Sequence, residues 1–269
     1  MALSQAPSSQ SPLPLAGRTA VVTGASRGIG LAVTAELSRQ GARVVGGART
    51  PGRELARYTP HALAVDLSTP QGPADLAAYA LEELGHIDIL VNNVASTLPQ
   101  KGGFLTIDDD LWRTEFDLTF LSCVRTSRAC LPSLLDRRGT IVNISSAHAR
   151  VPLPSVAAYS AAKAALTNLS KALSEEFAPH GLRVNTVTPG LVRTGVWTEP
   201  GSEGERLAHE SGLSLEELVE SLPGEAGVST GQFAEPEEVA ALVAFLASPA
   251  TPNLTGADVV LDGGMIKTV

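Results

Sequence analysis

A phenol and an ammonium group stand four positions apart in the segment AAYSAAKAAL, residues 157–166. Residues four apart lie on one face of a helix. A cation beside a phenol favours the phenolate and lowers the tyrosine pKa, so Tyr159 with Lys163 beside it can exchange a proton with a substrate oxygen. The alternative is a half-exposed surface pair, and the rest of the chain has to decide between the two.

The segment TGASRGIG, residues 23–30, has the composition of a phosphate-binding turn. Glycine is needed where the backbone turns sharply and approaches a pyrophosphate group at the N-terminus of a helix. The spacing is GxxxGxG, and an expected strand before it and helix after it strengthen an otherwise weak glycine signal. The residues of this phosphate turn that we expect to contact a cofactor are Gly24, Ser26, Arg27, Gly28, Ile29 and Gly30.

Two arginines indicate which dinucleotide binds. An NAD site usually has an acid about 20 residues past the glycine turn, where it holds the ribose hydroxyls. Here the second expected strand ends in GGART without an acid, and Arg49 stands there while Arg27 lies in the phosphate turn. Guanidinium groups match a 2′-phosphate. The sequence therefore favours NADP(H) over NAD(H), although either arginine alone is also typical of an ordinary surface.

The elements that must position these residues alternate along the chain. Apolar, β-branched runs typical of strands buried on both faces lie at 19–23, 43–48, 62–65, 87–92, 140–144, 183–187 and 258–261. Segments of helical period lie at 29–40, 73–84, 108–136, 157–178 and 235–247. This alternation predicts an α/β fold, a single-domain Rossmann-type doubly wound parallel sheet of about seven strands with helices on both faces.

We expect three regions in the chain. Residues 1–14 are rich in Ser, Pro and Gln, which is typical of a disordered tail. Residues 15–269 form one dinucleotide-binding and catalytic domain. Within it, residues 191–232 carry Gly, Pro, Ser and Glu with short helical patches and no strand pattern. Such long insertions are usually binding loops, so we expect a substrate lid, with a disordered surface excursion as the alternative.

Composition disfavours several classes of partner. The net charge is −8 and the basic residues are scattered, which argues against nucleic acid, and no apolar run reaches the roughly 18 residues of a membrane span. Cys123 and Cys130 lie too far apart on one expected helix to form a disulfide. With no signal-peptide pattern, they predict a cytoplasmic protein. The five histidines are scattered and give no metal-ligand spacing, so we expect no metal.

The chain resembles the short-chain dehydrogenase/reductase family over about residues 15–265. The motifs that carry the resemblance occur in the order and at the spacing of the family. They are TGxxxGxG at 23–30, Asp66 in VDL, Asn92-Asn93 in LVNNVA, Ser146, YxxxK at 159–163, Pro189-Gly190 with Thr194, and DGG at 262–264. Each is weak alone, but chance similarity does not produce all of them in order.

The resemblance implies roles for individual residues. Tyr159 would be the general acid in carbonyl reduction and the base in the reverse direction, Lys163 would hydrogen-bond the nicotinamide ribose, and Ser146 would position the substrate oxygen. The further cofactor contacts that it implies are Asp66, Leu67, Asn92, Tyr159, Lys163, Pro189, Gly190 and Thr194.

Two positions depart from the family pattern. Thr119 stands where the family usually has the Asn of a catalytic tetrad and proton relay, and Asp117 is a less likely match. A threonine can hold a water molecule but lacks the amide, which affects the relay more than hydride transfer. Ala95 replaces the usual Gly of the NNAG element.

The resemblance implies an NADP(H)-dependent oxidoreductase that transfers a hydride between nicotinamide and a small-molecule carbonyl or secondary alcohol. Oxidation as the main direction is one alternative, and a non-catalytic NADPH-binding regulatory or interaction protein is another. His148, Leu153 and Trp197 are the candidate substrate contacts, although His148 fits a solvated loop equally well. The helices at 108–136 and 157–178 commonly pair between subunits in the family, so we expect a homotetramer, with a homodimer next.

Overall fold

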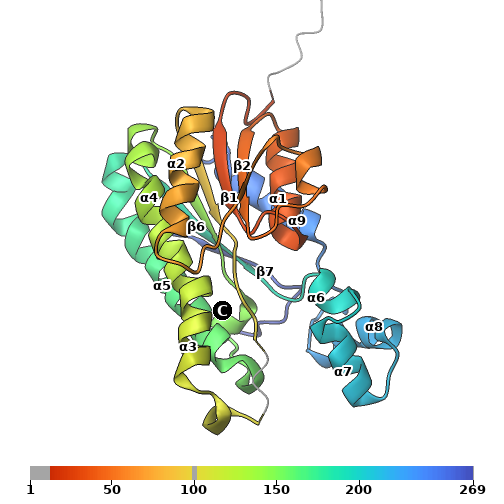
Figure 1. Cartoon of the computed structure of the whole chain (residues 1–269). Coiled ribbons are helices and arrows are strands. Elements are labelled where there is room, and N and C mark those ends of the chain that lie inside the picture. The colour runs from red at the N-terminus through yellow and green to blue at the C-terminus, as the bar shows by residue number, and fades with distance from the viewer. Residues whose placement is uncertain (1–12, 99–101, 269) are drawn as a thin grey trace, which may run out of the picture.

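Seven parallel strands form one sheet in the computed structural model, which describes residues 13–98 and 102–268 (Figure 1). The strands are β1 (Thr19–Thr23), β2 (Arg43–Ala48), β3 (His61–Ala64), β4 (Ile89–Asn92), β5 (Thr140–Ile144), β6 (Arg183–Pro189) and β7 (Asp258–Leu261). Their order in the sheet is β3-β2-β1-β4-β5-β6-β7. The order reverses between β1 and β4, the point where open sheets of this kind bind ligands. The predicted α/β fold class is confirmed.

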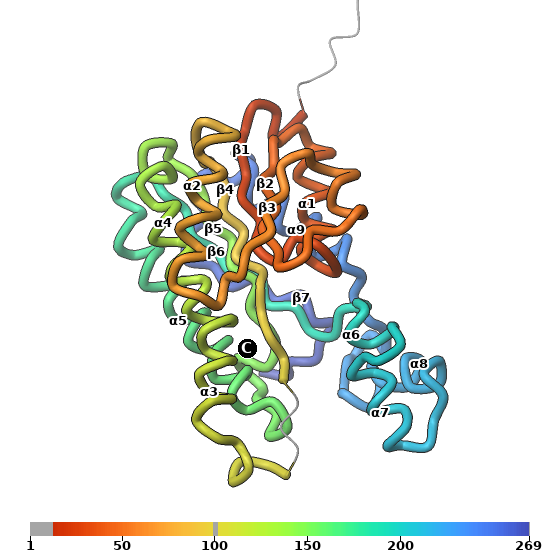
Figure 2. Tube along the Cα trace, viewed as in Figure 1, coloured from red at the N-terminus to blue at the C-terminus, as the bar shows by residue number. Residues whose placement is uncertain are grey.

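Helices cover both faces of this sheet. They are α1 (Gly28–Arg39), α2 (Gly72–Leu84), α3 (Asp109–Phe116), α4 (Ser122–Asp136), α5 (Ala157–Phe177), α6 (Gly195–Thr198), α7 (Glu203–Ser211), α8 (Leu215–Glu225) and α9 (Pro236–Ala247). α1 and α9 pack against each other over one face, and α2, α4 and α5 lie over the other (Figures 1 and 2). The fold therefore has three layers, as the alternation of strands and helices predicts.

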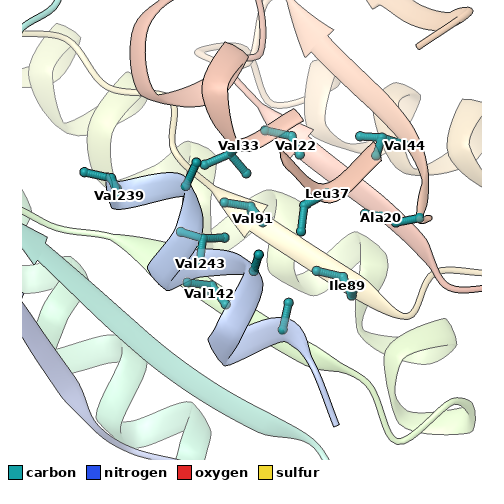
Figure 3. Close-up of a cluster of buried hydrophobic side chains, with 14 of the residues drawn as sticks. Ala20, Val22, Val33, Leu37, Val44, Ile89, Val91, Val142, Val239 and Val243 are labelled. Carbon is teal, nitrogen blue, oxygen red and sulfur yellow. The ribbon is translucent and has the colours of Figure 1, made fainter. Parts of the chain in front are cut away.

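Two hydrophobic cores separate these layers, because successive strand residues point to opposite faces. Ala20 and Val22 of β1 join the core under α1 and α9, where they meet Val33 and Val243 (Figure 3). Val21, between them in sequence, belongs to the core under α2 and α4. Burial on both faces explains why the strands are continuous apolar runs.

The segment expected as one helix over 108–136 is divided into three parts. α3 ends at Phe116, the π-helical turn η3 covers Asp117–Leu121, and α4 begins at Ser122. π turns inside helices occur frequently at functional sites. This one holds Thr119, whose side chain is fully buried.

Residues 191–232 contain three helices, α6 to α8, where the sequence analysis expects only short helical patches. Ser202 and Ser214 cap α7 and α8 by accepting backbone N–H groups, so each helix has a defined start. In Figure 1 the three helices lie at the lower right, away from the sheet. Their expected role as a lid stays a prediction.

Two other expectations concern the ends and surroundings of the chain. Of the tail expected at residues 1–14, residues 1–12 lie outside the described part. Among the helices of 13–98 and 102–268, none is long and apolar enough to cross a membrane.

Candidate active site

Close backbone contacts shape the phosphate turn between β1 and α1. Gly28 has a φ of 53°, in the left-handed region that favours glycine. A Cβ on Gly30 would lie 2.2 Å from the carbonyl oxygen of Gly24, so any larger residue would displace the turn. α1 begins at Gly28, and its N-cap residue Arg27 gives no side-chain hydrogen bond. The first backbone N–H groups of α1 are therefore not capped by the Arg27 side chain, and a helix start of this kind can bind an anion.

A cavity of about 560 Å³ opens beside the phosphate turn at the carboxyl ends of the strands. Its walls are residues 24 and 26–29 of the phosphate turn, 48–50 at the end of β2, 65 and 67 after β3, 93–95 and 97 after β4, 118 in η3, and 194–196 and 199 at α6. This volume suits a cofactor-sized ligand. The predicted cofactor residues that line it are Gly24, Ser26, Arg27, Gly28, Ile29, Arg49, Leu67 and Thr194.

The two arginines singled out by the sequence both line this cavity. Arg27 and Arg49 are exposed, and neither forms an ion pair with another of the described residues. Asp66, after β3, accepts hydrogen bonds from the Ser68 hydroxyl at 2.7 Å and the Ser68 backbone at 2.9 Å. These bonds, and then the charge of Arg49, lower the pKa of Asp66. The carboxylate thus turns toward Ser68 and leaves both guanidinium groups available.

The two asparagines at the end of β4 have different surroundings. The Asn92 amide donates to Ser127 Oγ at 3.0 Å and to Asn143 Oδ1 at 2.8 Å within the core. The Asn93 amide donates to the Thr23 carbonyl at 3.0 Å, and Asn93 lines the cavity. Asn92, a predicted cofactor contact, therefore joins β4 to its neighbours. Asn93, which the sequence analysis does not propose as a contact, is the one at the cavity.

Tyr159 and Lys163 come together on the first turns of α5, beside the end of β5. The Lys163 Nζ lies 5.8 Å from the centre of the Tyr159 ring and donates to the Ile144 carbonyl at 2.6 Å. Only 2% of Lys163 is exposed. Burial lowers the lysine pKa to about 8, against the opposing effects of Cys123 and Glu115. Because the ammonium group lies inside the protein, the alternative of a half-exposed surface pair does not hold for Lys163.

The pKa of Tyr159 moves in the direction opposite to the sequence prediction. Burial of the phenol raises it, the hydroxyl of Ser146 partly opposes this, and the charge of Glu115 raises it further. Desolvation disfavours the charged phenolate, and it outweighs the effect expected from a neighbouring cation. Burial therefore disfavours ionisation of the Tyr159 phenol.

Ser146 lies two residues past the end of β5 and next to Tyr159. Its Oγ accepts from the backbone N–H of His148 at 3.2 Å and caps the short helix η4 (Ala147–Ala149). The His148 ring contacts the Val151 carbonyl through Nδ1 at 3.1 Å. Leu153 is 42% exposed, just before α5. These side chains share the loop that joins β5 to α5, and their contact with a substrate stays a prediction.

The remaining predicted residues lie at the end of β6 and after it. The Gly190 backbone N–H donates to the Leu261 carbonyl at 3.0 Å, so Pro189 and Gly190 join the end of β6 to β7. Thr194 is the N-cap of α6 and lines the cavity. Trp197 packs on Phe233, with ring centres 6.3 Å apart. The face of α6 that lines the cavity carries Val196 instead.

Thr119 contacts the loop after β4, residues 93–98. Its Oγ1 accepts from the Ser96 backbone N–H at 3.1 Å. One turn earlier, Glu115 is also fully buried, and its Oε1 accepts from the Leu98 backbone N–H at 2.6 Å. Glu115 is not among the residues predicted from the sequence. The sequence does contain a signal for Glu115. Glu115, Thr119 and Cys123 follow one another at intervals of four residues, which places them on one face of a helix, and all three are buried.

Similarity to known proteins, in sequence and in structure, shows the family of this chain. The family described as enoyl-(acyl carrier protein) reductase matches residues 24–266. The chain belongs to the short-chain dehydrogenase/reductase family of oxidoreductases.

Relatives in this family act on different substrates. The chain is 35% identical to 2,3-dihydroxy-2,3-dihydro-p-cumate dehydrogenase of Pseudomonas putida, over 95% of this chain and 97% of that protein. It is 31% identical to 3-oxoacyl-(acyl-carrier-protein) reductase of Vibrio cholerae, over 93% and 98%. Among solved structures, L-sorbose reductase from Gluconobacter frateurii, complexed with NADPH and L-sorbose, has a TM-score of 0.88 at 31% identity, covering 96% of this chain and 100% of that one.

Proposed function

We propose that this protein is an NADP(H)-dependent reductase of a small carbonyl compound, with Tyr159 as the general acid. The observation that carries the proposal is the buried Lys163 ammonium 5.8 Å from the Tyr159 ring, beside Ser146 and at the sheet edge that holds the dinucleotide-sized cavity. A similar solved structure is a reductase complexed with NADPH, which supports both the cofactor and the direction.

The cavity fits a nicotinamide dinucleotide phosphate. Gly30 has no room for a side chain, so the phosphate turn is tight and its backbone can approach a pyrophosphate. The N-terminus of α1, which the Arg27 side chain does not cap, would bind the charge of that pyrophosphate. Arg27 and Arg49 would hold the 2′-phosphate, because neither is committed to another described residue. Bound there, the cofactor would supply the hydride.

The side chains of the chain supply the proton and the orientation. Tyr159 donates its phenolic proton to the carbonyl oxygen as that oxygen gains negative charge. Ser146 hydrogen-bonds the same oxygen and holds it near the phenol. Lys163 keeps a positive charge beside the phenolate that remains. Burial raises the pKa of Tyr159, which supports a phenol that keeps its proton until the carbonyl oxygen gains negative charge.

Further parts of the proposal rest on position in the fold. We assign His148, Leu153 and Trp197 to the surroundings of the substrate, and residues 191–232 to a lid that closes over it. The free, buried thiols of Cys123 and Cys130 suit a cytoplasmic protein. The exposed faces of α4 and α5 would pair between subunits of a homotetramer.

A turnover screen tests this function. Ketones, aldehydes and secondary alcohols are offered with NADPH, NADH, NADP⁺ and NAD⁺, and cofactor absorbance is followed. We expect reduction of at least one carbonyl, faster with NADPH. NADPH binding without turnover of any compound would favour the alternative, a non-catalytic NADPH-binding protein.

A further inference from the structure

One arginine side chain joins two walls of the cavity beside the phosphate turn. Arg125 lies near the start of α4, and its guanidinium group has partners in two other segments. Nη1 donates to the Ser68 carbonyl at 2.9 Å, and Nη2 donates to the Asp117 carboxylate at 3.0 Å. Ser68 belongs to the loop after β3, and Asp117 begins the π turn η3. Arg125 therefore bridges two segments that are far apart in the sequence.

Each partner of Arg125 is the direct neighbour of a residue that lines the cavity. Leu67 precedes Ser68, Leu118 follows Asp117, and both leucines line the cavity. The guanidinium group is planar and presents its donors in a fixed fork. Because one fork holds both Ser68 and Asp117, it also fixes the separation of the two leucines beside them.

The wall after β3 depends on this contact, because Ser68 is held through its hydroxyl, its N–H and its carbonyl. The hydroxyl and the backbone N–H donate to the Asp66 carboxylate at 2.7 and 2.9 Å, and the carbonyl accepts from Arg125. Thr69 Oγ1 donates to the Asp66 carbonyl at 2.9 Å. Leu67 stands between Asp66 and Ser68, so its position follows from these bonds.

The two leucines lie at the end of the cavity that would hold the adenosine half of a dinucleotide. Arg49, assigned above to the 2′-phosphate, lines the same cavity as Leu67. After the hydrogen bonds from Ser68, the charge of Arg49 also lowers the pKa of Asp66, which places Arg49 near this wall. Apolar walls with a few polar groups beside them suit a flat base.

Stability alone does not account for the position of Arg125. Its side chain is 21% exposed and the side chain of Asp117 is 39% exposed, and ion pairs that water reaches contribute little to stability. Arg125 is also not among the residues that line the cavity. A role in ligand binding therefore has to act through the two walls that it joins.

We propose that Arg125 is a positioning residue for the cofactor, which holds Leu67 and Leu118 at the separation that suits the adenine ring. The inference rests on the proposed function, because it takes the ligand of the cavity to be NADP(H). Since Arg125 acts on the adenosine end of the cavity, its loss should weaken cofactor binding and leave the chemistry at Tyr159 in place.

Arg125→Met tests this role, because methionine keeps much of the side-chain length and has no hydrogen-bond donor. Calorimetric titration compares NADPH with adenosine 2′,5′-bisphosphate, which carries the base and the 2′-phosphate but no nicotinamide. We expect both ligands to lose affinity by the same factor, about fivefold or more, the lower end for coupling between linked sites. A general loosening of the fold would instead weaken NADPH more than its fragment and lower the urea midpoint, which we expect to stay near that of the parent.

Arg128→Met is the matched control. Arg128 lies one turn further along α4, is exposed, and forms no hydrogen bond or ion pair with another residue of 13–98 and 102–268, so this variant should bind both ligands as the parent does. Arg125→Lys keeps the charge and loses the fork. Attraction between the charge at position 125 and the cofactor phosphates predicts parental affinity for Arg125→Lys, whereas positioning predicts a loss.

The outcomes separate this inference from the proposed function. Parental affinity of Arg125→Met or of Arg125→Lys for both ligands would overturn the role of Arg125 and leave the proposed function standing. A parent that binds neither NADPH nor the bisphosphate would overturn the proposed cofactor, and the role of Arg125 with it. If Arg125→Met does not fold, Asp117→Ala removes one of the two anchors and carries the same titrations with the same expected direction.

Discussion

The buried lysine makes a quantitative prediction about stability. The pKa of Lys163 falls from 10.5 to about 8 on folding, so the folded state binds this proton more weakly than the unfolded state. The resulting penalty is complete below pH 8 and disappears as the pH rises toward 10.5. At about 1.4 kcal/mol per pH unit, it amounts to about 3 kcal/mol at pH 7 and about 1 kcal/mol at pH 9.5.

Lys163→Met removes this penalty and keeps most of the side-chain volume. Loss of the bond to the Ile144 carbonyl affects the variant equally at both pH values, so only the ammonium contributes to the pH dependence. We expect the stability of the variant relative to the parent to fall by about 2 kcal/mol between pH 7 and pH 9.5. Urea unfolding at a fixed protein concentration measures the free energy of unfolding of the variant and of the parent at each pH.

Lys171→Met is the control for this measurement, because Lys171 lies on the same helix with 60% of its side chain exposed and pairs with Glu175. Its stability relative to the parent should change much less with pH. If the difference in unfolding free energy between Lys163→Met and the parent is the same at pH 7 and at pH 9.5, burial does not lower the pKa of Lys163. That result would refute the reasoning.

Three further predictions concern the cofactor, the lid and assembly. Arg49→Asp should lower NADPH affinity at least tenfold, since a charge-assisted hydrogen bond contributes about 1.5–3 kcal/mol, and should shift preference toward NADH in binding titrations; equal affinity of the parent for both cofactors would contradict it. Amide hydrogen exchange in residues 191–232 should slow when NADPH binds, and unchanged exchange would count against a lid. Sedimentation at micromolar concentration should give a tetramer, or else a dimer, and a monomer would exclude the proposed pairing of α4 and α5.

Local signals in the sequence account for most of the fold. The strands are β-branched runs because both faces of the sheet are buried, and the observed β1 and β2 span the predicted residues. The phosphate turn is predictable because the Gly24 carbonyl lies so close to Gly30 that only glycine fits at position 30. The spacing of Tyr159 and Lys163 likewise gives their shared face, since both lie on the regular helix α5.

Properties that arise from tertiary packing were harder to predict. The direction of the Tyr159 pKa depends on how much water the fold removes from the phenol, which spacing on one helix does not report. Asn92 and Asn93 are adjacent and chemically identical, and only the turn of the chain after β4 decides which one lines the cavity.

Two further features, the start of α8 and the buried position of Glu115, have recognisable signals in the sequence. Ser214 followed by Glu217 forms a capping box at the start of α8, and this pattern marks a helix start. Glu115 likewise continues a buried helical stripe. The π turn at 117–121 has no comparable signal, because helical sequence surrounds it on both sides.

The most direct test of the proposed chemistry is turnover by Tyr159→Phe, measured with a carbonyl compound that the parent reduces. Phenylalanine keeps the ring and its packing beside Lys163 and removes the acidic proton. We predict that kcat falls by about 10²-fold or more, while NADPH affinity from calorimetric titration stays close to that of the parent. Turnover by Tyr159→Phe at the parent rate would contradict the assignment of Tyr159 as the proton donor.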